Sequence, residues 1–141
     1  LYRQGLRGNY TARENLHLTL AFIGEYQDSE RVLEVLDGIG FEPLEIRLNG
    51  IGTFGDLWWI GLEQCQSLQD YVHRLRRALA QASVPFDRKR FSPHITILRR
   101  SSMDLARVPG MTIEPAEMVV THVSLMRSDR GKSGMIYTEI V

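Results

Sequence analysis

We predict an α+β fold with an antiparallel sheet from three features of the 141-residue sequence. Residues 29–37 and 66–82 carry apolar side chains at the 3.6-residue period of an amphipathic helix. Several other segments alternate apolar and polar side chains, which is the period of a half-buried strand. These elements follow one another as a strand, a helix, two strands, a helix and then mostly strands. That order favours an antiparallel sheet, because a parallel sheet requires regular alternation of strands and helices.

Capping and turn residues set the expected limits of these elements. Asp28 or Ser29 can cap the first helix, which we expect to run to about Asp37, and residues 66–82 form the stronger helix. Turn-forming residues between the second and third strands predict that these two strands pair. The last two strands are expected to form a terminal hairpin around residues 129–131. The expected strands are 15–23, 44–48, 58–62, 94–98, 118–126 and 135–141.

Composition and charge describe a single globular domain that covers residues 1–141. The chain is 43% hydrophobic and 24% charged, and its 17 basic residues match its 17 acidic residues. A balanced charge excludes a broad basic field for long nucleic acids, so phosphate recognition is expected to come from a local cluster. No apolar run reaches the roughly 20 residues of a membrane helix, and Cys65 is the single cysteine. We therefore expect a monomeric cytoplasmic protein without membrane contact or an internal disulfide.

One short pattern occurs twice in the sequence. The first copy, N-L-H-L-T-L, places His17 and Thr19 two positions apart, and the second, S-P-H-I-T-I, does the same with His94 and Thr96. Because strand residues i and i+2 share a face, each strand presents an imidazole beside a hydroxyl and turns its aliphatic side chains the other way. A single His-x-Thr on a strand is more often a surface or structural feature. Its repetition, using two of only four histidines, indicates a shared functional role.

Two imidazoles that face one cleft suit displacement at phosphorus. The attacking and leaving oxygens lie on opposite sides of the phosphorus, so one neutral histidine can accept a proton from water while a protonated one donates to the departing oxygen. The ordinary pKa of a histidine side chain, about 6.5, lets both forms exist near neutral pH. Thr19 and Thr96 can donate hydrogen bonds to the non-bridging oxygens, where negative charge must be stabilised.

The second motif also lies in a basic stretch of the chain. A solvated charged loop explains Arg88 and Lys89. Arg99 differs because it ends the strand that carries His94, and we expect it to bind phosphate. Only Asp87 opposes the basic residues around this motif, which are Arg88, Lys89, Arg90, Arg99 and Arg100.

At these residues the sequence resembles the two-histidine (2H) phosphoesterase superfamily, and within it the RNA 2′,3′-cyclic phosphodiesterases first described as 2′-5′ RNA ligases. Residues 15–24 read N-L-H-L-T-L-A-F-I-G and residues 91–99 read F-S-P-H-I-T-I-L-R, which match the two family motifs except for Ile97 in place of leucine. The resemblance implies a bilobal α+β fold, with pseudo-two-fold antiparallel sheets, helices on the outside and a central cleft. The family has a strand and a helix ahead of the first motif, and we expect this chain, which begins at Leu1, to lack them.

The resemblance further implies metal-independent hydrolysis of RNA 2′,3′-cyclic phosphate ends to 2′-phosphomonoesters, with no cofactor and with RNA or an oligonucleotide as partner. In that chemistry His94 is the proton acceptor that activates water and His17 is the proton donor, and the roles exchange in the ligation direction. Thr19, Thr96 and Arg99 bind the substrate phosphate. Two alternatives stay open. The same site can act on a cyclic phosphate of ADP-ribose or on a 2′-5′ linked oligonucleotide, or the chain is a non-catalytic module that binds RNA ends.

The aromatic residues receive separate predictions. Phe22 and Phe91 lie next to the two motifs and are candidates for stacking on a nucleobase. Trp58 and Trp59 alternate across a strand, so one of them is expected in the core. The two histidines outside the motifs have no carboxylate or cysteine at metal-ligand spacing, so no metal site is expected.

Overall fold

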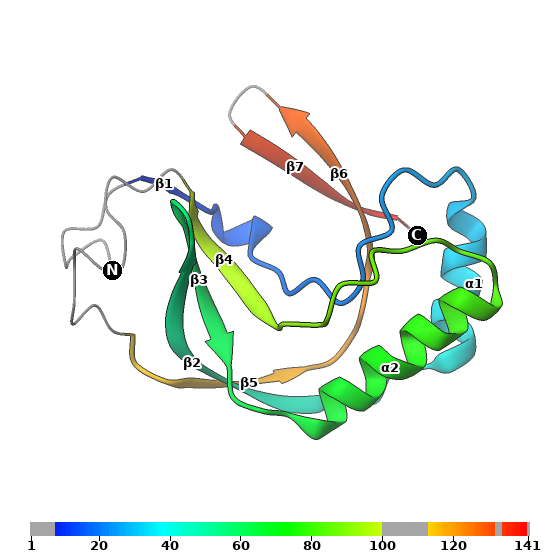
Figure 1. Ribbon diagram of the computed structural model, residues 1–141, viewed down its shortest axis with the longest axis horizontal. Coiled ribbons are helices and arrows are strands. Elements are labelled where there is room, and N and C mark those ends of the chain that lie inside the picture. Colours follow the sequence, from blue (N-terminus) through cyan, green and yellow to red (C-terminus); the bar gives the residue numbers. More distant parts are fainter. Residues whose placement is uncertain (1–7, 100–112, 132–133, 141) are drawn as a thin grey trace. The chain divides into compact units, whose positions relative to one another are not determined.

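A computed structural model of the chain describes residues 8–99, 113–131 and 134–140 (Figure 1). The pairings β1–β4, β2–β3, β3–β4 and β6–β7 are all antiparallel, which confirms the predicted α+β class. In chain order the elements are β1 (Asn9–Tyr10), the 3-10 helix η2 (Arg13–Asn15), α1 (Ser29–Ile39), β2 (Leu44–Phe54), β3 (Leu57–Leu62), α2 (Gln66–Gln81), β4 (His94–Arg99), β5 (Ala116–Val120), β6 (Leu125–Gly131) and β7 (Gly134–Ile140).

The chain divides into two compact units, each assembled from three stretches of sequence. The first unit comprises Leu1–Thr19, Glu45–Cys65 and Ser92–Met118. The second unit comprises Leu20–Leu44, Gln66–Phe91 and Val119–Val141. No helix within residues 8–99, 113–131 and 134–140 is long and apolar enough to span a membrane.

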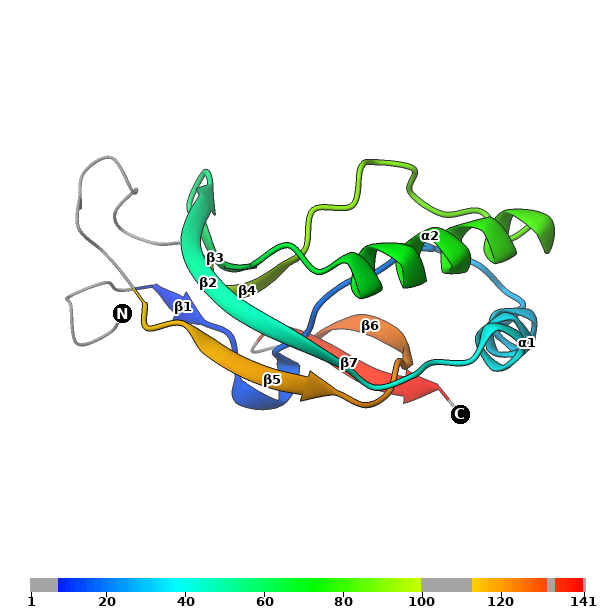
Figure 2. The same cartoon turned by 90° about the horizontal axis from the view of Figure 1, so that it is seen from below.

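The first unit supplies most of a five-stranded sheet with the strand order β1-β4-β3-β2-β5. Trp58 on β3 is paired with Leu98 on β4, and both side chains are fully buried. β2 curves strongly along its length (Figure 2). The register between β2 and β3 shifts between Leu48 and Ile51, and Gly50 there has a φ of +83°. A bulge of this kind bends a strand, because one strand contains an extra residue that the other does not match.

The second unit buries apolar side chains between its helices and neighbouring segments. Asp28 caps α1, because its carboxylate accepts a hydrogen bond from the Arg31 backbone N–H at 3.2 Å. α1 packs against α2 (Figure 1), and β6 and β7 form an antiparallel hairpin. The buried cluster between these elements includes Val32, Tyr71, Leu75, Leu79 and Val84. Leu68 and Val72 of α2 are also buried.

The predicted strand at residues 15–23 is wrong. Arg13–Asn15 forms a 3-10 helix instead, and within the segment only Leu18 makes a strand-like bridge, to Ile95. The carbonyl groups of the following residues bind elsewhere: Leu20 accepts from the Arg76 guanidinium and Phe22 from the Asp87 backbone N–H. The alternating pattern arises because the segment is half-buried, not because it pairs as a continuous strand.

Two other predicted limits also need correction. The glycine-rich stretch 49–52 lies inside β2, and the turn to β3 falls at Gly55 and Asp56. The terminal hairpin is formed by β6 and β7, while β5 joins the larger sheet beside β2. Residues 129–131 belong to β6 rather than to a turn, because they pair with residues 134–136 of β7. The two helices, β3 and β4 lie where the sequence predicts them, within two residues.

Candidate active site

The two histidine motifs lie side by side in the first unit. Leu18 pairs with Ile95 in an antiparallel bridge. An antiparallel pair in this register is expected to set each histidine opposite the threonine of the other motif, with the polar side chains on the face away from Leu18 and Ile95. Opposed residues in an antiparallel pair have Cβ atoms about 4.5–5.5 Å apart. We call this cluster the quartet; its members are His17, Thr19, His94 and Thr96.

Both imidazoles of the quartet are held by the same local hydrogen bond. The Nδ1 atom of His17 lies 2.6 Å from the carbonyl oxygen of Asn15, and the Nδ1 atom of His94 lies 2.7 Å from that of Ser92. A carbonyl oxygen can only accept, so Nδ1 carries the proton in each ring. In the neutral imidazole the lone pair is therefore on Nε2. His17 is exposed and His94 is half-buried.

A register shift in β4 brings Arg99 to the face of the quartet. Trp59 pairs with Thr96, whereas the neighbouring Trp58 pairs with Leu98, so Ile97 is an extra residue in β4. Trp58 and Trp59 point to opposite faces of β3, and their partners Leu98 and Thr96 do the same. Arg99, which follows Leu98, returns to the Thr96 face and is exposed. In a regular strand the odd spacing from His94 would place Arg99 on the opposite face.

Aromatic side chains border the quartet at His94. The His94 ring centroid is 6.0 Å from that of Trp59 and 5.5 Å from that of Phe54. The Trp59 indole lies over Gly52, where a Cβ atom would come within 2.2 Å of it. The indole Nε1 is buried and has no hydrogen-bond partner among the described residues. One tryptophan of the pair is in the core, as predicted; the structure identifies it as Trp58.

Sequence reasoning missed Phe54. The predicted strand 44–48 ends before Phe54, whereas β2 runs to it. The sequence signal for a longer strand is an aromatic residue immediately before the turn residues Gly55 and Asp56. A strand that extends to this turn brings Phe54 to the edge of the quartet.

The other residues predicted to contact substrate belong to the second unit. Phe22 is 61% exposed. Phe91 is half-buried, and the Arg76 guanidinium carbon lies 6.0 Å from its ring centroid. In the basic stretch, Lys89 is within 3.9 Å of the Asp87 carboxylate and Arg88 lies over a phenylalanine ring, as expected of a solvated loop. Arg90 is exposed, and Arg100 lies outside the described residues.

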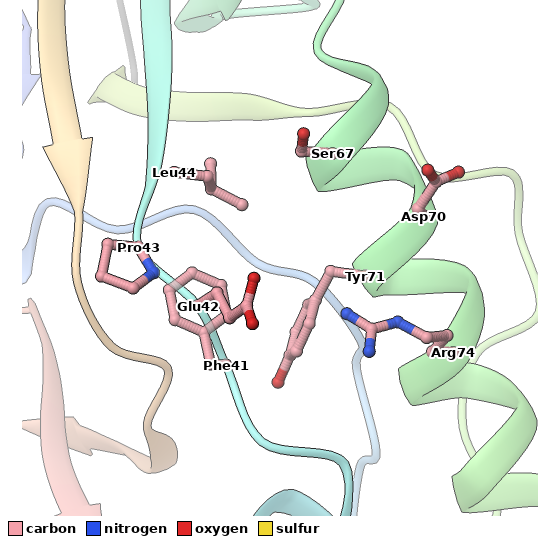
Figure 3. Close-up of a pocket in the computed structure, with 8 residues that line it drawn as sticks. All are labelled: Phe41, Glu42, Pro43, Leu44, Ser67, Asp70, Tyr71 and Arg74. Carbon is pink, nitrogen blue, oxygen red and sulfur yellow. The ribbon is translucent and has the colours of Figure 1, made fainter.

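A separate pocket of about 430 Å³ lies in the second unit and contains no residue of the quartet (Figure 3). Tyr71 and Arg74 line it from α2, and the guanidinium carbon of Arg74 lies 5.7 Å from the Tyr71 ring centroid. Burial raises the pKa of the Tyr71 phenol, and the nearby Arg74 charge partly offsets that effect. Across residues 8–99, 113–131 and 134–140, no three His, Cys, Asp or Glu side chains are grouped so that they could hold a metal ion.

Comparison with known proteins identifies related sequences along almost the whole chain. The model of the family described as the 2′-5′ RNA ligase superfamily matches residues 2–132. An RNA 2′,3′-cyclic phosphodiesterase of Methanothermobacter thermautotrophicus is 32% identical over 142 residues, which cover 90% of this chain and 77% of that protein. The RNA 2′,3′-cyclic phosphodiesterase of Escherichia coli K12 is 30% identical, with coverages of 94% and 77%.

Solved structures show the same fold. The crystal structure of E. coli LigT complexed with 3′-AMP superposes with a TM-score of 0.77 at 27% identity, covering 95% of this chain and 79% of that one. The MHV ns2 PDE domain has a TM-score of 0.55 at 11% identity, a likeness of fold alone. These likenesses agree with the α+β class predicted from the sequence.

Proposed function

Because the chain belongs to the 2′-5′ RNA ligase superfamily, we propose that it is an enzyme that hydrolyses RNA 2′,3′-cyclic phosphate ends to 2′-phosphomonoesters. The observation that supports this proposal is the antiparallel bridge between Leu18 and Ile95, the central residues of the two His-x-Thr motifs. The RNA 2′,3′-cyclic phosphodiesterases to which the chain is similar support the choice of a cyclic phosphate as the reacting group.

The two histidines divide the proton transfers. Neutral His94 accepts a proton at Nε2 from water, and the water oxygen forms a bond to phosphorus. The bond from phosphorus to the 3′ oxygen breaks on the opposite side, and protonated His17 donates its Nε2 proton to that oxygen. The product is a 2′-phosphomonoester with a free 3′-hydroxyl. The Nδ1 hydrogen bonds to backbone carbonyls support proton transfer by both imidazoles, because they leave Nε2 as the transferring atom in each ring. Which histidine is the acid and which the base follows from the family resemblance.

Charge on the phosphate is stabilised by the remaining groups of the site. Thr19 and Thr96 donate hydroxyl hydrogen bonds to the non-bridging oxygens, whose negative charge grows as the bond to the leaving oxygen breaks. Arg99 supplies a positive charge and several N–H donors on the same face. The register shift at Ile97 supports this role for Arg99, since an extra residue in β4 reverses the alternation of faces between His94 and Arg99.

Two alternatives share this site. Another phosphoester, such as a cyclic phosphate of ADP-ribose or a 2′-5′ linked oligonucleotide, would use the same proton transfers. A module that only binds RNA ends would need positive charge and hydrogen-bond donors. It would not need two imidazoles fixed in the same tautomer, so the matched Nδ1 contacts favour an enzyme.

The decisive experiment measures turnover of an oligonucleotide that ends in a 2′,3′-cyclic phosphate, in excess EDTA, and identifies the product isomer. We expect a 2′-phosphate, and a loss of about 10²- to 10⁴-fold in kcat for His17→Ala and for His94→Ala. His73→Ala is the matched control, because His73 is an exposed histidine on α2. Full activity in either motif variant, or a 3′-phosphate product, would contradict the proposed mechanism.

A further inference from the structure

Two segments of the second unit are continuous in the chain with the histidine motifs. Residues 20–22 directly follow the threonine of the first motif, and residues 86–91 lead to the histidine of the second. The Asp87 backbone N–H donates to the Phe22 carbonyl at 2.7 Å, which joins the two segments. A displacement of either segment is therefore transmitted along the backbone to a motif.

Arg76 of α2 binds both of these segments with one guanidinium group. Its Nη1 donates to the Lys89 carbonyl at 2.7 Å, and its Nη2 donates to the Leu20 carbonyl at 3.3 Å. The guanidinium carbon lies 5.8 Å from the Phe86 ring centroid and 6.0 Å from that of Phe91, within the range of cation–π contacts. All four partners belong to the two segments, so one side chain connects the end of the first motif to the start of the second.

The two carbonyl contacts determine how the guanidinium is oriented. The Arg76 Nε atom is buried and has no hydrogen-bond partner among the described residues, although an unpaired buried donor costs free energy. Within the part of the chain that the structure describes, no carboxylate forms an ion pair with Arg76. The group is thus held by backbone oxygens and aromatic rings, and its planar, rigid shape fixes the spacing of the two oxygens that it binds.

We infer that Arg76 is a positioning residue for the proposed reaction, on which this inference rests. It acts through the backbone of Leu20 and Lys89, not on the substrate. In-line displacement requires both imidazoles at set places, and a misplacement of about 1 Å can lower the rate by about 100-fold. The effect reaches His94 most directly, because the Ser92 carbonyl that holds its Nδ1 is three residues after Lys89.

The test compares two replacements of this arginine. kcat and KM are measured for adenosine 2′,3′-cyclic phosphate with Arg76→Met and Arg76→Lys, at a temperature where circular dichroism shows that each variant is folded. We expect both to lower kcat by about 10- to 100-fold while KM stays within about threefold. Lysine should not rescue the activity, because it keeps the charge but replaces the planar fork with a single point donor.

Two variants on the same helix are the matched controls. Arg77→Met removes an equal charge from an exposed position, so it reports any long-range effect of charge on the reaction. Leu79→Ala removes a buried side chain of the same unit and destabilises it without touching either segment's contacts with Arg76. Both should keep the kcat and KM of the unaltered protein under the same folded conditions.

Three kinetic results would overturn the inference. Full kcat in Arg76→Lys would mean that the positive charge is sufficient and the fork is not needed. An equal loss of kcat in Leu79→Ala would mean that lower stability of the unit explains the effect. A raised KM with unchanged kcat in Arg76→Met would assign the arginine to substrate binding instead.

A readout without turnover separates this inference from the proposed function. If the unaltered protein hydrolyses no 2′,3′-cyclic nucleotide, the proposed function fails, and the positioning is judged by NMR of the histidine ring nitrogens. Arg76→Met should shift the His94 signals away from those of the Nδ1–H tautomer. The signals of His122, whose ring contacts Thr121, should stay in place. Unchanged His94 signals would reject the positioning role.

Discussion

Gly52→Ala is the substitution that most directly tests how Trp59 packs beside the quartet. A Cβ atom at Gly52 would lie 2.2 Å from Cζ2, 2.4 Å from Cη2 and 2.7 Å from Cε2 of Trp59. Carbon atoms in contact are about 3.5–4.0 Å apart. The indole must therefore move by more than about 1 Å, toward side chains that already surround it. His94 is one of these, with its ring centroid 6.0 Å from that of Trp59.

The expected size of the effect follows from this displacement. Overpacking a well-packed site lowers the free energy of unfolding by about 1–3 kcal/mol. For a chain of this length each kcal/mol lowers Tm by about 4 °C, so we expect a fall of about 4–12 °C. A misplacement of about 1 Å at a catalytic group lowers the rate by up to about 100-fold, so we expect kcat on a 2′,3′-cyclic nucleotide to fall as well.

Gly38→Ala is the matched control for this experiment. Gly38 lies in α1, and a Cβ atom there would have nothing within 4 Å. Alanine in a helix is more favourable than glycine by up to about 1 kcal/mol, so Tm should rise and kcat should not change. Thermal melts and steady-state kinetics of the two variants test opposite signs. A Gly52→Ala protein with unchanged Tm and kcat would refute the packing described for Trp59.

Three further predictions concern the second unit. Arg76→Met removes guanidinium hydrogen bonds to the Leu20 and Lys89 carbonyls. It should lower the free energy of unfolding, measured by urea titration, by about 2–4 kcal/mol. Arg77 is exposed, so Arg77→Met is the control and should change this free energy by under about 0.5 kcal/mol. Asp28→Ala removes the cap of α1 and should cost about 1 kcal/mol by the same measurement, and no loss would contradict the cap. Because burial raises the pKa of Tyr71, the folded state favours the neutral phenol; that stability is complete below pH about 10 and is lost as pH rises through the folded pKa. The unfolding free energy should therefore fall more steeply above pH 10 in the unaltered protein than in Tyr71→Phe, and parallel curves would reject this.

Local sequence patterns predicted both helices and the residues proposed for the site. The helical period of residues 66–82 predicts α2 almost to the residue, because a long amphipathic helix depends mainly on contacts within itself and one buried face. The two His-x-Thr patterns identify the quartet, since a spacing of two in extended backbone is enough to put an imidazole and a hydroxyl on one side. The segment 15–23 shows the limit of the same reasoning. Its alternation of apolar and polar residues reflects a half-buried segment, and its backbone contacts residues far along the chain rather than a neighbouring strand.

Only the tertiary structure decided how these parts meet. The sequence places each histidine beside its own threonine, but only the bridge between Leu18 and Ile95 shows that the two motifs lie next to each other. The extra residue at Ile97 puts Arg99 on the quartet face. In a regular strand, five residues after His94, Arg99 would lie on the opposite face. Strand register and bulges are fixed by hydrogen bonds and packing between segments distant in sequence, and a one-residue shift moves a side chain to the other face of the sheet. Local periodicity carries no information about that choice.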